Sequence, residues 1–317
     1  MIRLPRLKKK QRLGLLNGIS IESNGVACAK VSTKNGLHVK SSGFLPYEDN
    51  EWQGALRRLI SSERLYGEVY ISLSDDFYNL LLIDAPDVPE AEMADAIKWK
   101  VKDVISQPLE SVTIQYFKLP EDAYRGRMNM VYVAVAEKAL IQQIVDTCEH
   151  KGLEIRGITI KDLSLSNLLF ASGVTEGEST GMVSLGTSEG QMRLLESGNL
   201  YLARNLGIGV DHLSGLNEEA LSDYDRAQCD ELMFDIKRSL DYYESQLGKG
   251  LVNRIILMPA DVNNVRLAGV LNEKLDVQVQ PWHWQFTENI SHESESPEIL
   301  DHCISAIGAV IGGWLED

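Results

Sequence analysis

Residues 18–26, Gly-Ile-Ser-Ile-Glu-Ser-Asn-Gly-Val, and residues 182–195, Met-Val-Ser-Leu-Gly-Thr-Ser-Glu-Gly-Gln-Met-Arg-Leu-Leu, decide the fold. In each stretch, apolar residues alternate with small or polar ones on both sides of a turn that contains glycine. This pattern is typical of a β-hairpin. In each case more strand and then a helix follow along the chain. The sequence therefore predicts two similar α/β halves, each beginning with a matching hairpin.

The spacing of apolar residues predicts the other elements of both halves. In the first half we expect strands within 13–40 and at 69–73, and helices at 51–64 and 163–171. The stretch 79–160 has its own order: strand 80–83, helix 89–105, strands 112–118 and 130–135, helix 137–151 and strand 153–160. This βαββαβ order predicts an inserted subdomain over 79–157. In the second half we expect strands at 182–185, 191–195, 200–204, 254–258 and 277–282, and helices at 225–247, 262–275 and 301–314, with a polar surface loop at 287–297.

Length and charge restrict the function. The 317 residues suit two domains. We divide them into a basic tail (1–12), a first half (13–180) and a second half (181–317) that includes the C-terminal helix. The net charge of −15 argues against a nucleic-acid partner. The four cysteines, at 28, 148, 229 and 303, are too far apart for a metal site and read as reduced structural residues. No apolar run suits a signal peptide or a membrane helix.

The first twelve residues are the exception to this acidity, because they carry Arg3, Arg6, Lys8, Lys9, Lys10 and Arg12. Two interpretations stay open. One is a solvated tail, and the other is a weak electrostatic tether to anionic lipid or to an acidic partner. His38, His150, His212, His283, His292 and His302 show no metal-ligand or catalytic-triad spacing, so the sequence predicts neither a metal site nor a catalytic group.

Four segments, in their order and spacing, resemble the PilM-like family of type IV pilus assembly proteins, and most closely its branch in the mannose-sensitive haemagglutinin (MSHA) pilus. They are Gly18 to Val26, Glu92 to Trp99 with Pro108-Leu109-Glu110 beyond it, Val183 to Ser188, and Ile236-Lys-Arg-Ser-Leu-Asp-Tyr-Tyr243. The resemblance covers nearly everything after residue 12. It implies an α/β, bilobed actin-like fold, which is a duplicated ribonuclease-H-like ATPase fold, with an inserted subdomain.

In nucleotide-binding members of such a fold, the two hairpins hold the phosphates, and an aspartate in each orients hydrated Mg²⁺. Here Ser20 stands in the first aspartate position and Glu22 in a glycine position, beside Ser23. A serine cannot supply the anchoring charge, and an inward Glu22 would repel a triphosphate by several kcal/mol, on the order expected for close like charges.

The second hairpin departs from the family pattern less than the first does. Ser184 replaces its aspartate, whereas Gly186, Thr187 and Ser188 retain a phosphate-sized turn. The turn expected to receive adenosine contains Met258 and Pro259, which fill space and remove an N–H donor. Together these departures predict no hydrolysis, no resident cofactor and no metal, with ATP and Mg²⁺ binding as the alternative.

The resemblance implies a cytoplasmic, non-catalytic scaffold peripheral to the inner membrane. Its partner would be a bitopic inner-membrane pilus protein, PilN-like, whose N-terminal cytoplasmic tail enters a groove between the first-half core (1–77) and the insert. Pilus motor ATPases are further candidate partners. The alternatives are an ATP-binding switch or slow ATPase of the same machinery, and an actin-like filament former. Extended-peptide capture suits such a groove.

Overall fold

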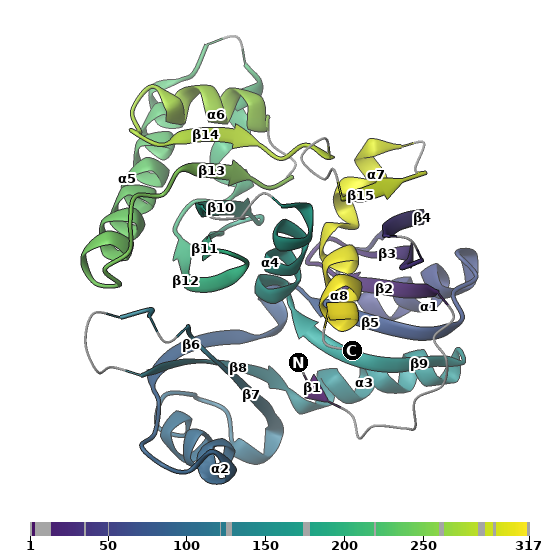
Figure 1. Ribbon diagram of the computed structural model, residues 1–317. Coiled ribbons are helices and arrows are strands. Elements are labelled where there is room, and N and C mark those ends of the chain that lie inside the picture. Colours follow the sequence, from purple (N-terminus) through teal and green to yellow (C-terminus); the bar gives the residue numbers. More distant parts are fainter. Residues whose placement is uncertain are drawn as a thin grey trace. The chain divides into compact units, whose positions relative to one another are not determined.

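A computed structural model describes residues 2–3 (backbone only), 14–34, 36–49, 51–120, 122–124, 129–173, 178–218, 220–259, 263–284, 289–293 and 296–315 (Figure 1). Most of the basic tail therefore lies outside the described residues. The internal contacts divide the chain into two compact units. Unit 1 comprises 1–119, 128–168 and 289–317, and unit 2 comprises 120–127 and 169–288. Each unit is described by itself.

Unit 1 is built on a seven-stranded sheet in the order β1-β9-β5-β2-β3-β4-β15. Its strands are β1 (Ile2–Arg3), β2 (Leu15–Ile21), β3 (Gly25–Ser32), β4 (Leu37–Pro46), β5 (Gly67–Leu73), β9 (Leu153–Ile160) and β15 (Ile290–His292). The expected first hairpin forms between β2 and β3, and the Glu22 amide closes its turn by donating to the Gly25 carbonyl at 2.9 Å. Strand β15 falls inside the expected polar loop 287–297, where it pairs with β4.

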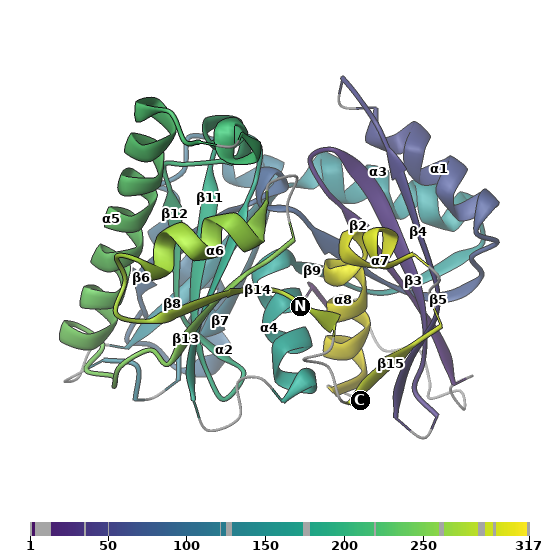
Figure 2. The same ribbon diagram turned by 90° about the horizontal axis from the view of Figure 1, so that it is seen from above.

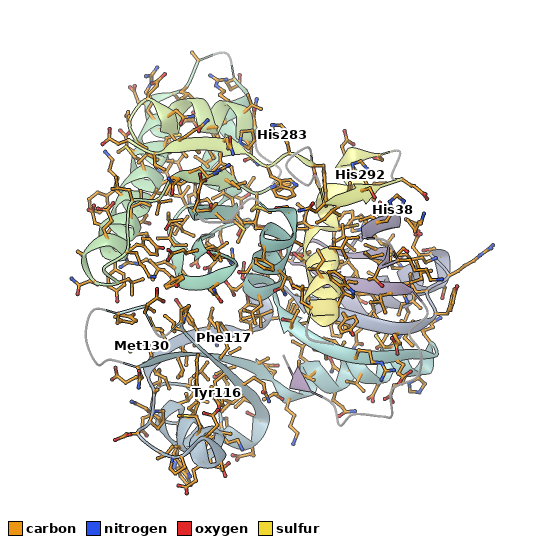
Figure 3. All side chains as sticks on the ribbon, in the orientation of Figure 1. His38, Tyr116, Phe117, Met130, His283 and His292 are labelled. Carbon is orange, nitrogen blue, oxygen red and sulfur yellow. The ribbon has the colours of Figure 1, made fainter. Side chains whose placement is uncertain are left out.

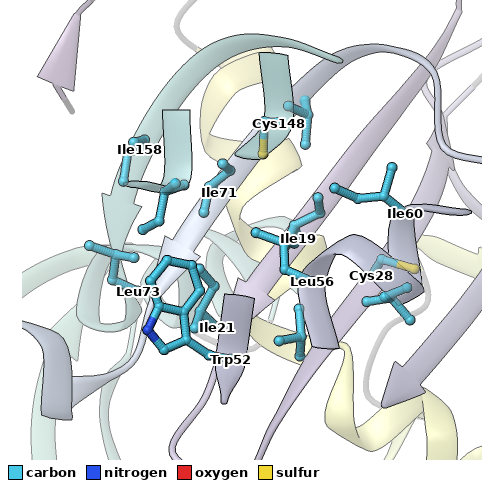
Figure 4. Close-up of a cluster of buried hydrophobic side chains, with 14 of the residues drawn as sticks. Ile19, Ile21, Cys28, Trp52, Leu56, Ile60, Ile71, Leu73, Cys148 and Ile158 are labelled. Atoms are coloured by element: carbon cyan, nitrogen blue, oxygen red, sulfur yellow. The ribbon is translucent and has the colours of Figure 1, made fainter. Parts of the chain in front are cut away.

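Helices cover both faces of this sheet (Figure 2). On one face, α1 (Trp52–Ser62) and α3 (Lys138–His150) pack on Ile19, Ile21 and Ile71 in the main apolar core (Figure 4). On the other face, α4 (Lys161–Ser172) and α8 (Ile304–Leu315) approach closely. Gly18 permits this approach, because a Cβ there would lie 2.1 Å from the Ala306 carbonyl oxygen.

The insert of unit 1 is smaller than the sequence predicts. Its three-stranded sheet has the order β6-β8-β7, from β6 (Asn79–Asp84), β7 (Val112–Lys118) and β8 (Met130–Glu137). Helix α2 (Glu90–Val101) covers one face, and the short helices η1 (Asp75–Phe77) and η2 (Leu109–Ser111) flank the strands. The expected βαββαβ subdomain included 137–157, but α3 and β9 belong to the main core. The last four residues of β9, 157–160, are all buried, and β9 pairs in parallel with β5 of the large sheet.

Unit 2 holds a five-stranded sheet in the order β12-β11-β10-β13-β14. Its strands are β10 (Ser179–Leu185), β11 (Gly190–Glu196), β12 (Asn199–Leu206), β13 (Arg254–Leu257) and β14 (Gln278–Pro281). Its helices are α5 (Asp223–Ser245), α6 (Asn264–Asn272) and the 3₁₀ segment η3 (Val210–Asn217). Ser222 caps α5 by accepting a hydrogen bond from the Asp225 amide at 3.1 Å.

The two sheets repeat one topology. In unit 1, β2, β3 and β4 form an antiparallel meander, and β5 and then β9 add in parallel beside β2. In unit 2, β10, β11 and β12 form the same meander, and β13 and then β14 add in parallel beside β10. Helix α3 precedes β9 in unit 1, as α6 precedes β14 in unit 2. Helix α3 and β9 therefore belong to the repeated topology and not to the insert.

The C-terminal segment differs from its expected assignment to the second half. By its contacts, 289–317 belongs to unit 1. Helix α7 (Pro297–His302) precedes α8, and α8 packs on β2, β3 and β5. Every residue of α8 from Ile304 to Gly313 is buried. A helix buried on every side needs more than one neighbour, and the unit 1 sheet together with Ser164 and Asn167 of α4 provides this cover.

Candidate functional site

The first hairpin places Ser20 inside the protein. Its side chain has 0% exposure on β2, opposite Ser72 of β5. The Ser20 hydroxyl has no hydrogen-bond partner among the described residues. Ser72 accepts a hydrogen bond from Ser164 of α4 at 2.9 Å. The residue in the expected aspartate position is therefore packed beneath a helix within unit 1.

Glu22 forms an ion pair. Its Oε2 lies 3.0 Å from Nζ of Lys161, and the two side chains are only 14% and 21% exposed. Lys161 is the first residue of α4, so the carboxylate also lies near a helix N-terminus, which favours negative charge. The Tyr47 hydroxyl donates to the Glu22 carbonyl, and Ser23 is exposed. The expected repulsion of phosphate by Glu22 is thus offset, because Lys161 compensates the charge.

In unit 2, Ser184 accepts a hydrogen bond from a buried arginine. The donor is Nη1 of Arg193 at 2.7 Å, and Arg193 is 0% exposed between the buried apolar residues Met192 and Leu194. Arg193 pairs with Met182 across the β10–β11 ladder, two residues before Ser184 on the same face. The Arg193 guanidinium therefore lies beside Ser184, the residue in the second expected aspartate position.

The turn after Ser184 keeps part of its anion-binding shape. The Gly186 amide donates to the Glu189 carbonyl at 2.9 Å, and Thr187 and Ser188 are exposed. The carbonyls of Gly186 and Thr187 accept from Val210 and Asp211 at 2.8 and 3.0 Å. Within the described ranges, no protein acceptor is found for the amide N–H groups of Thr187 and Ser188. Two adjacent amide donors on an exposed turn can bind an anion.

The expected adenosine turn lies at the same edge of the unit 2 sheet, because β10 and β13 are parallel. Met258 is 3% exposed, and its amide donates to the Val183 carbonyl at 2.7 Å. Asn264 donates to the Met258 carbonyl at 2.8 Å. Pro259 is half-buried, and Trp282 is buried one strand further along. The turn is thus filled by side chains and fastened by hydrogen bonds.

A hollow of about 490 Å³, part of it open to solvent, lies between the main sheet of unit 1 and its insert. It is lined mostly by apolar side chains from β5, β7, β8, β9 and α4: Leu73, Phe117, Ala134, Ala136, Ile158, Ile160 and Leu163. Polar groups complete the lining: Tyr78, Thr113, Gln115, Tyr116 and Thr159. The Tyr78 hydroxyl donates to Asp162, which is 2% exposed at the start of α4.

An unpaired strand edge borders this hollow. Strand β7 is the last strand of the insert sheet, so in the described chain its outer edge carries no further strand. Tyr116 contributes to the α2 side of the insert and Phe117 to the side of the main core (Figure 3). Across the hollow, β1 pairs with β9 only at Gly157 and Ile158. Exposed backbone donors and acceptors therefore adjoin an apolar floor.

The structure brings together residues that sequence reasoning missed. Lys161 gives no sequence signal for its pairing with Glu22, because 139 residues separate them. Arg193 does give one, since a charge within Met-Arg-Leu-Leu on a buried strand is unusual. The family resemblance implied a groove between 1–77 and the insert, without naming lining residues; the hollow also draws Ile158, Thr159, Ile160 and Leu163 from outside both ranges. All four cysteines are free and buried.

No protein-family model and no curated protein matches this chain. Among solved structures, it is similar to the PilM–PilN type IV pilus biogenesis complex, at 19% identity and a TM-score of 0.73, over 94% of this chain and 98% of that chain. It is also similar to the cytoplasmic domain of EpsL, an inner-membrane component of the type II secretion system of Vibrio cholerae (12% identity, TM-score 0.51, 93% and 94% covered).

A third similar structure is a Bacteroides thetaiotaomicron protein of unknown function with an actin-like ATPase fold (12% identity, TM-score 0.50, 92% and 96% covered). At these identities the likeness concerns the fold. Across the part of the chain that the structure describes, no helix is long and apolar enough to cross a bilayer. The duplicated sheet topology and these neighbours together show that the chain has the actin-like fold.

Proposed function

We propose that this chain is a non-catalytic scaffold of type IV pilus assembly that binds the cytoplasmic tail of an inner-membrane, PilN-like partner. The observation that carries the proposal is the apolar hollow beside the free edge of β7. The similar structure of a PilM–PilN complex supports the choice of machinery. The finer assignment, to an MshI-like protein of the MSHA pilus at the cytoplasmic side of the inner membrane, rests on the four sequence segments described above.

An extended tail suits this site for a physical reason. A peptide that adds to β7 would satisfy backbone donors and acceptors along the strand, and alternate side chains would point to one face. On that face, Phe117, Ile158 and Leu163 offer an apolar surface. Burial of a single Leu or Ile side chain contributes about 1.5–3 kcal/mol, so anchors of this kind would add to the backbone pairing along β7.

The non-catalytic part of the proposal is supported by both hairpins. Ser20 is buried with no carboxylate in its place, and Glu22 is committed to Lys161. In unit 2, the hydroxyl of Ser184 is engaged by Arg193. A hydrated magnesium ion needs oxygen ligands with negative charge, and neither hairpin position supplies a free one.

A titration of labelled tail peptide tests the peptide site. The probe is a synthetic, fluorescently labelled N-terminal cytoplasmic tail of a PilN-like inner-membrane protein from the same organism, and binding is followed by fluorescence anisotropy. Thr113→Trp puts a large ring into the hollow from a half-buried edge position, and we expect affinity to fall by about tenfold or more, equivalent to about 1.4 kcal/mol. Thr113→Val keeps the shape and serves as the control. Absence of binding by the unmodified chain, or equal binding by both variants, would remove the proposal.

A second candidate, an ATP-binding switch, is favoured by the exposed Gly186–Ser188 turn with its two available amides. Thermal melting with and without millimolar Mg-ATP separates the two functions. A ligand that binds the native state must stabilise it, by about 2.7 kcal/mol at a hundredfold excess over Kd. We expect no shift for a scaffold, and a clear rise would establish the switch instead.

A further inference from the structure

The backbone of β7 has a fixed orientation in the insert sheet. Just past the β7–β8 ladder, the Leu119 amide donates to the Met130 carbonyl at 3.3 Å. Along an antiparallel pair, residues that bond to the partner strand alternate with residues that do not. Counted back from Leu119, the odd-numbered residues of β7 bond to β8. The even-numbered residues Ile114 and Tyr116 therefore point their N–H and C=O groups to the outer edge.

The other side of β8 agrees with this alternation. There the Ala85 amide donates to the Asn129 carbonyl at 2.7 Å, just past the β6–β8 ladder. Odd-numbered residues of β8 thus bond to β6, and even-numbered residues bond to β7. Among the described residues, none forms a hydrogen bond with the backbone of Ile114 or Tyr116. The outer edge of β7 consequently offers an extended segment one defined set of donors and acceptors.

The depth of the hollow varies along β7. Three alternate side chains of this strand line it: Thr113, Gln115 and Phe117. Across the ladder from Thr113 and Gln115, β8 carries Ala136 and Ala134, which also line the hollow. Phe117 instead stacks on the buried Tyr132 ring, with 5.3 Å between the ring centroids. The hollow is therefore deep over the two alanines and shallow at the two rings.

The lining of the hollow is uncharged. No acidic or basic side chain belongs to the described lining, although the whole chain has a net charge of −15. Transfer of a charged side chain from water into such a site is costly, because no opposite charge compensates it there. The hollow therefore favours uncharged side chains of a bound segment.

The pairing geometry determines which side chains of a bound tail enter the hollow. Residues directly opposite each other on neighbouring strands have their side chains on the same face of the sheet. The tail residues opposite Thr113 and Gln115 therefore point into the hollow, and they are two positions apart, about 6.5 Å along a strand. The next tail residue on that face lies opposite Phe117 and meets the stacked rings.

We propose that a tail added to β7 binds in one register, with its backbone bonded to Ile114 and Tyr116 and with two uncharged side chains, two residues apart, inserted over Ala136 and Ala134. The inference rests on the proposed peptide function and specifies the sequence class of the tail. Ala134 and Ala136 are then specificity-determining residues, because their small size leaves the space that the two tail side chains fill.

Amide hydrogen exchange, resolved for single residues by NMR, tests the register in the unbound chain. We expect the amides of Ile114 and Tyr116 to exchange about tenfold faster, or more, than those of Gln115 and Phe117, because only the latter two bond to β8. Addition of the labelled PilN-like tail should then slow exchange at Ile114 and Tyr116 and leave the other two amides unchanged. The reverse pattern in the unbound chain overturns the register.

Small-to-large substitutions test the side-chain part with the same tail and fluorescence anisotropy. Ala134→Val and Ala136→Val each fill the hollow under one tail position, and valine is well suited to a strand, so both variants keep the fold. We expect each to weaken binding by about fivefold or more. Alanine at the tail position above the altered site should restore binding, and the two restoring tail positions should lie two residues apart. Ala94→Val, at an exposed position of α2, is the matched control and should bind like the unmodified chain.

The outcomes separate this inference from the proposed function. If the tail binds but neither Ala134→Val nor Ala136→Val weakens binding, or if Ala94→Val weakens it equally, the inference fails and the proposed function stands. Restoration of both variants by the same tail position, or by adjacent positions, also overturns the inference. If the tail does not bind the unmodified chain, the proposed function fails, and the exchange pattern of the unbound chain still confirms or refutes the orientation of β7.

Discussion

The hairpins β2–β3 and β10–β11 occupy the same place in two sheets of the same topology, yet they differ in how their turns are used. The first is closed, with Ser20 buried without a partner and Glu22 paired with Lys161. The second is half open, with Ser184 engaged by Arg193 and an exposed turn beyond it. Each hairpin therefore carries a serine where the family resemblance predicts an aspartate, and the two serines have different surroundings.

A serine in the expected aspartate position thus has a different structural role in each hairpin. In unit 1 the Ser20 hydroxyl is buried with no hydrogen-bond partner among the described residues, so it costs stability. In unit 2 the hydroxyl is an acceptor for a buried cation, and it contributes to stability. The predictions below separate these two roles by substitutions at matched positions.

The largest effect is expected from restoring the first aspartate. Ser20→Asp would bury an unpaired carboxylate opposite Ser72, and we expect a loss of about 3–5 kcal/mol in the free energy of unfolding without any stabilisation by Mg-ATP. Urea unfolding at pH 7 measures it. Because burial raises the pKa of the new carboxyl, the loss should shrink from pH 7 to pH 5. Ser20→Asn, of similar size, should show no such pH dependence, and stabilisation of Ser20→Asp by Mg-ATP would contradict the closed first hairpin.

The next effect concerns the helix that covers β2. A Cβ at Gly308 of α8 would lie 2.0 Å from the Ser164 carbonyl oxygen, so Gly308→Ala should destabilise the protein by about 1–3 kcal/mol. Gly269 of α6 has nothing within 4 Å of its Cβ position, so Gly269→Ala should stabilise by up to about 1 kcal/mol through helix propensity. Thermal melting compares them. If the two substitutions changed the melting temperature equally, the close packing of α8 on β2 would not be a feature that separates the first hairpin from the second.

The smallest effects, with opposite signs, are expected at the two serines themselves. Ser184→Ala removes one acceptor from the buried Arg193 guanidinium and should cost about 0.5–1.5 kcal/mol in the free energy of unfolding. Ser20→Ala removes a buried hydroxyl that has no partner among the described residues, and it should be neutral or stabilising by about 1 kcal/mol. Urea unfolding of both variants, with the unmodified chain beside them, measures the difference. If both variants changed the free energy of unfolding by the same amount in the same direction, the two serines would not differ in their structural role.

The sequence predicted the repeat because hairpin patterns are local. Alternation around Ser23-Asn24-Gly25 and around Gly186 to Gly190 needs no knowledge of distant residues, and both hairpins form. The helical spacing at 51–64 and 225–247 likewise matches α1 and α5 closely. The sequence predicts an insert over 79–157, but α3 and β9 lie in the main core, because local spacing does not state which of two sheets a strand will join.

The sequence by itself determined most of the elements, their duplication and the presence of serine rather than a carboxylate at positions 20 and 184, because these depend on residue type and near-neighbour spacing. Only the tertiary structure decided what replaced the lost groups. Lys161 meets Glu22, Arg193 reaches Ser184 across a ladder, and α8 returns to unit 1. Such pairings follow from burial and charge compensation between distant segments, which favour any partner that the folded chain brings within reach. The fold therefore determines which side chain pairs with Glu22 or with Ser184, whereas the residue types at these two positions are known from the sequence.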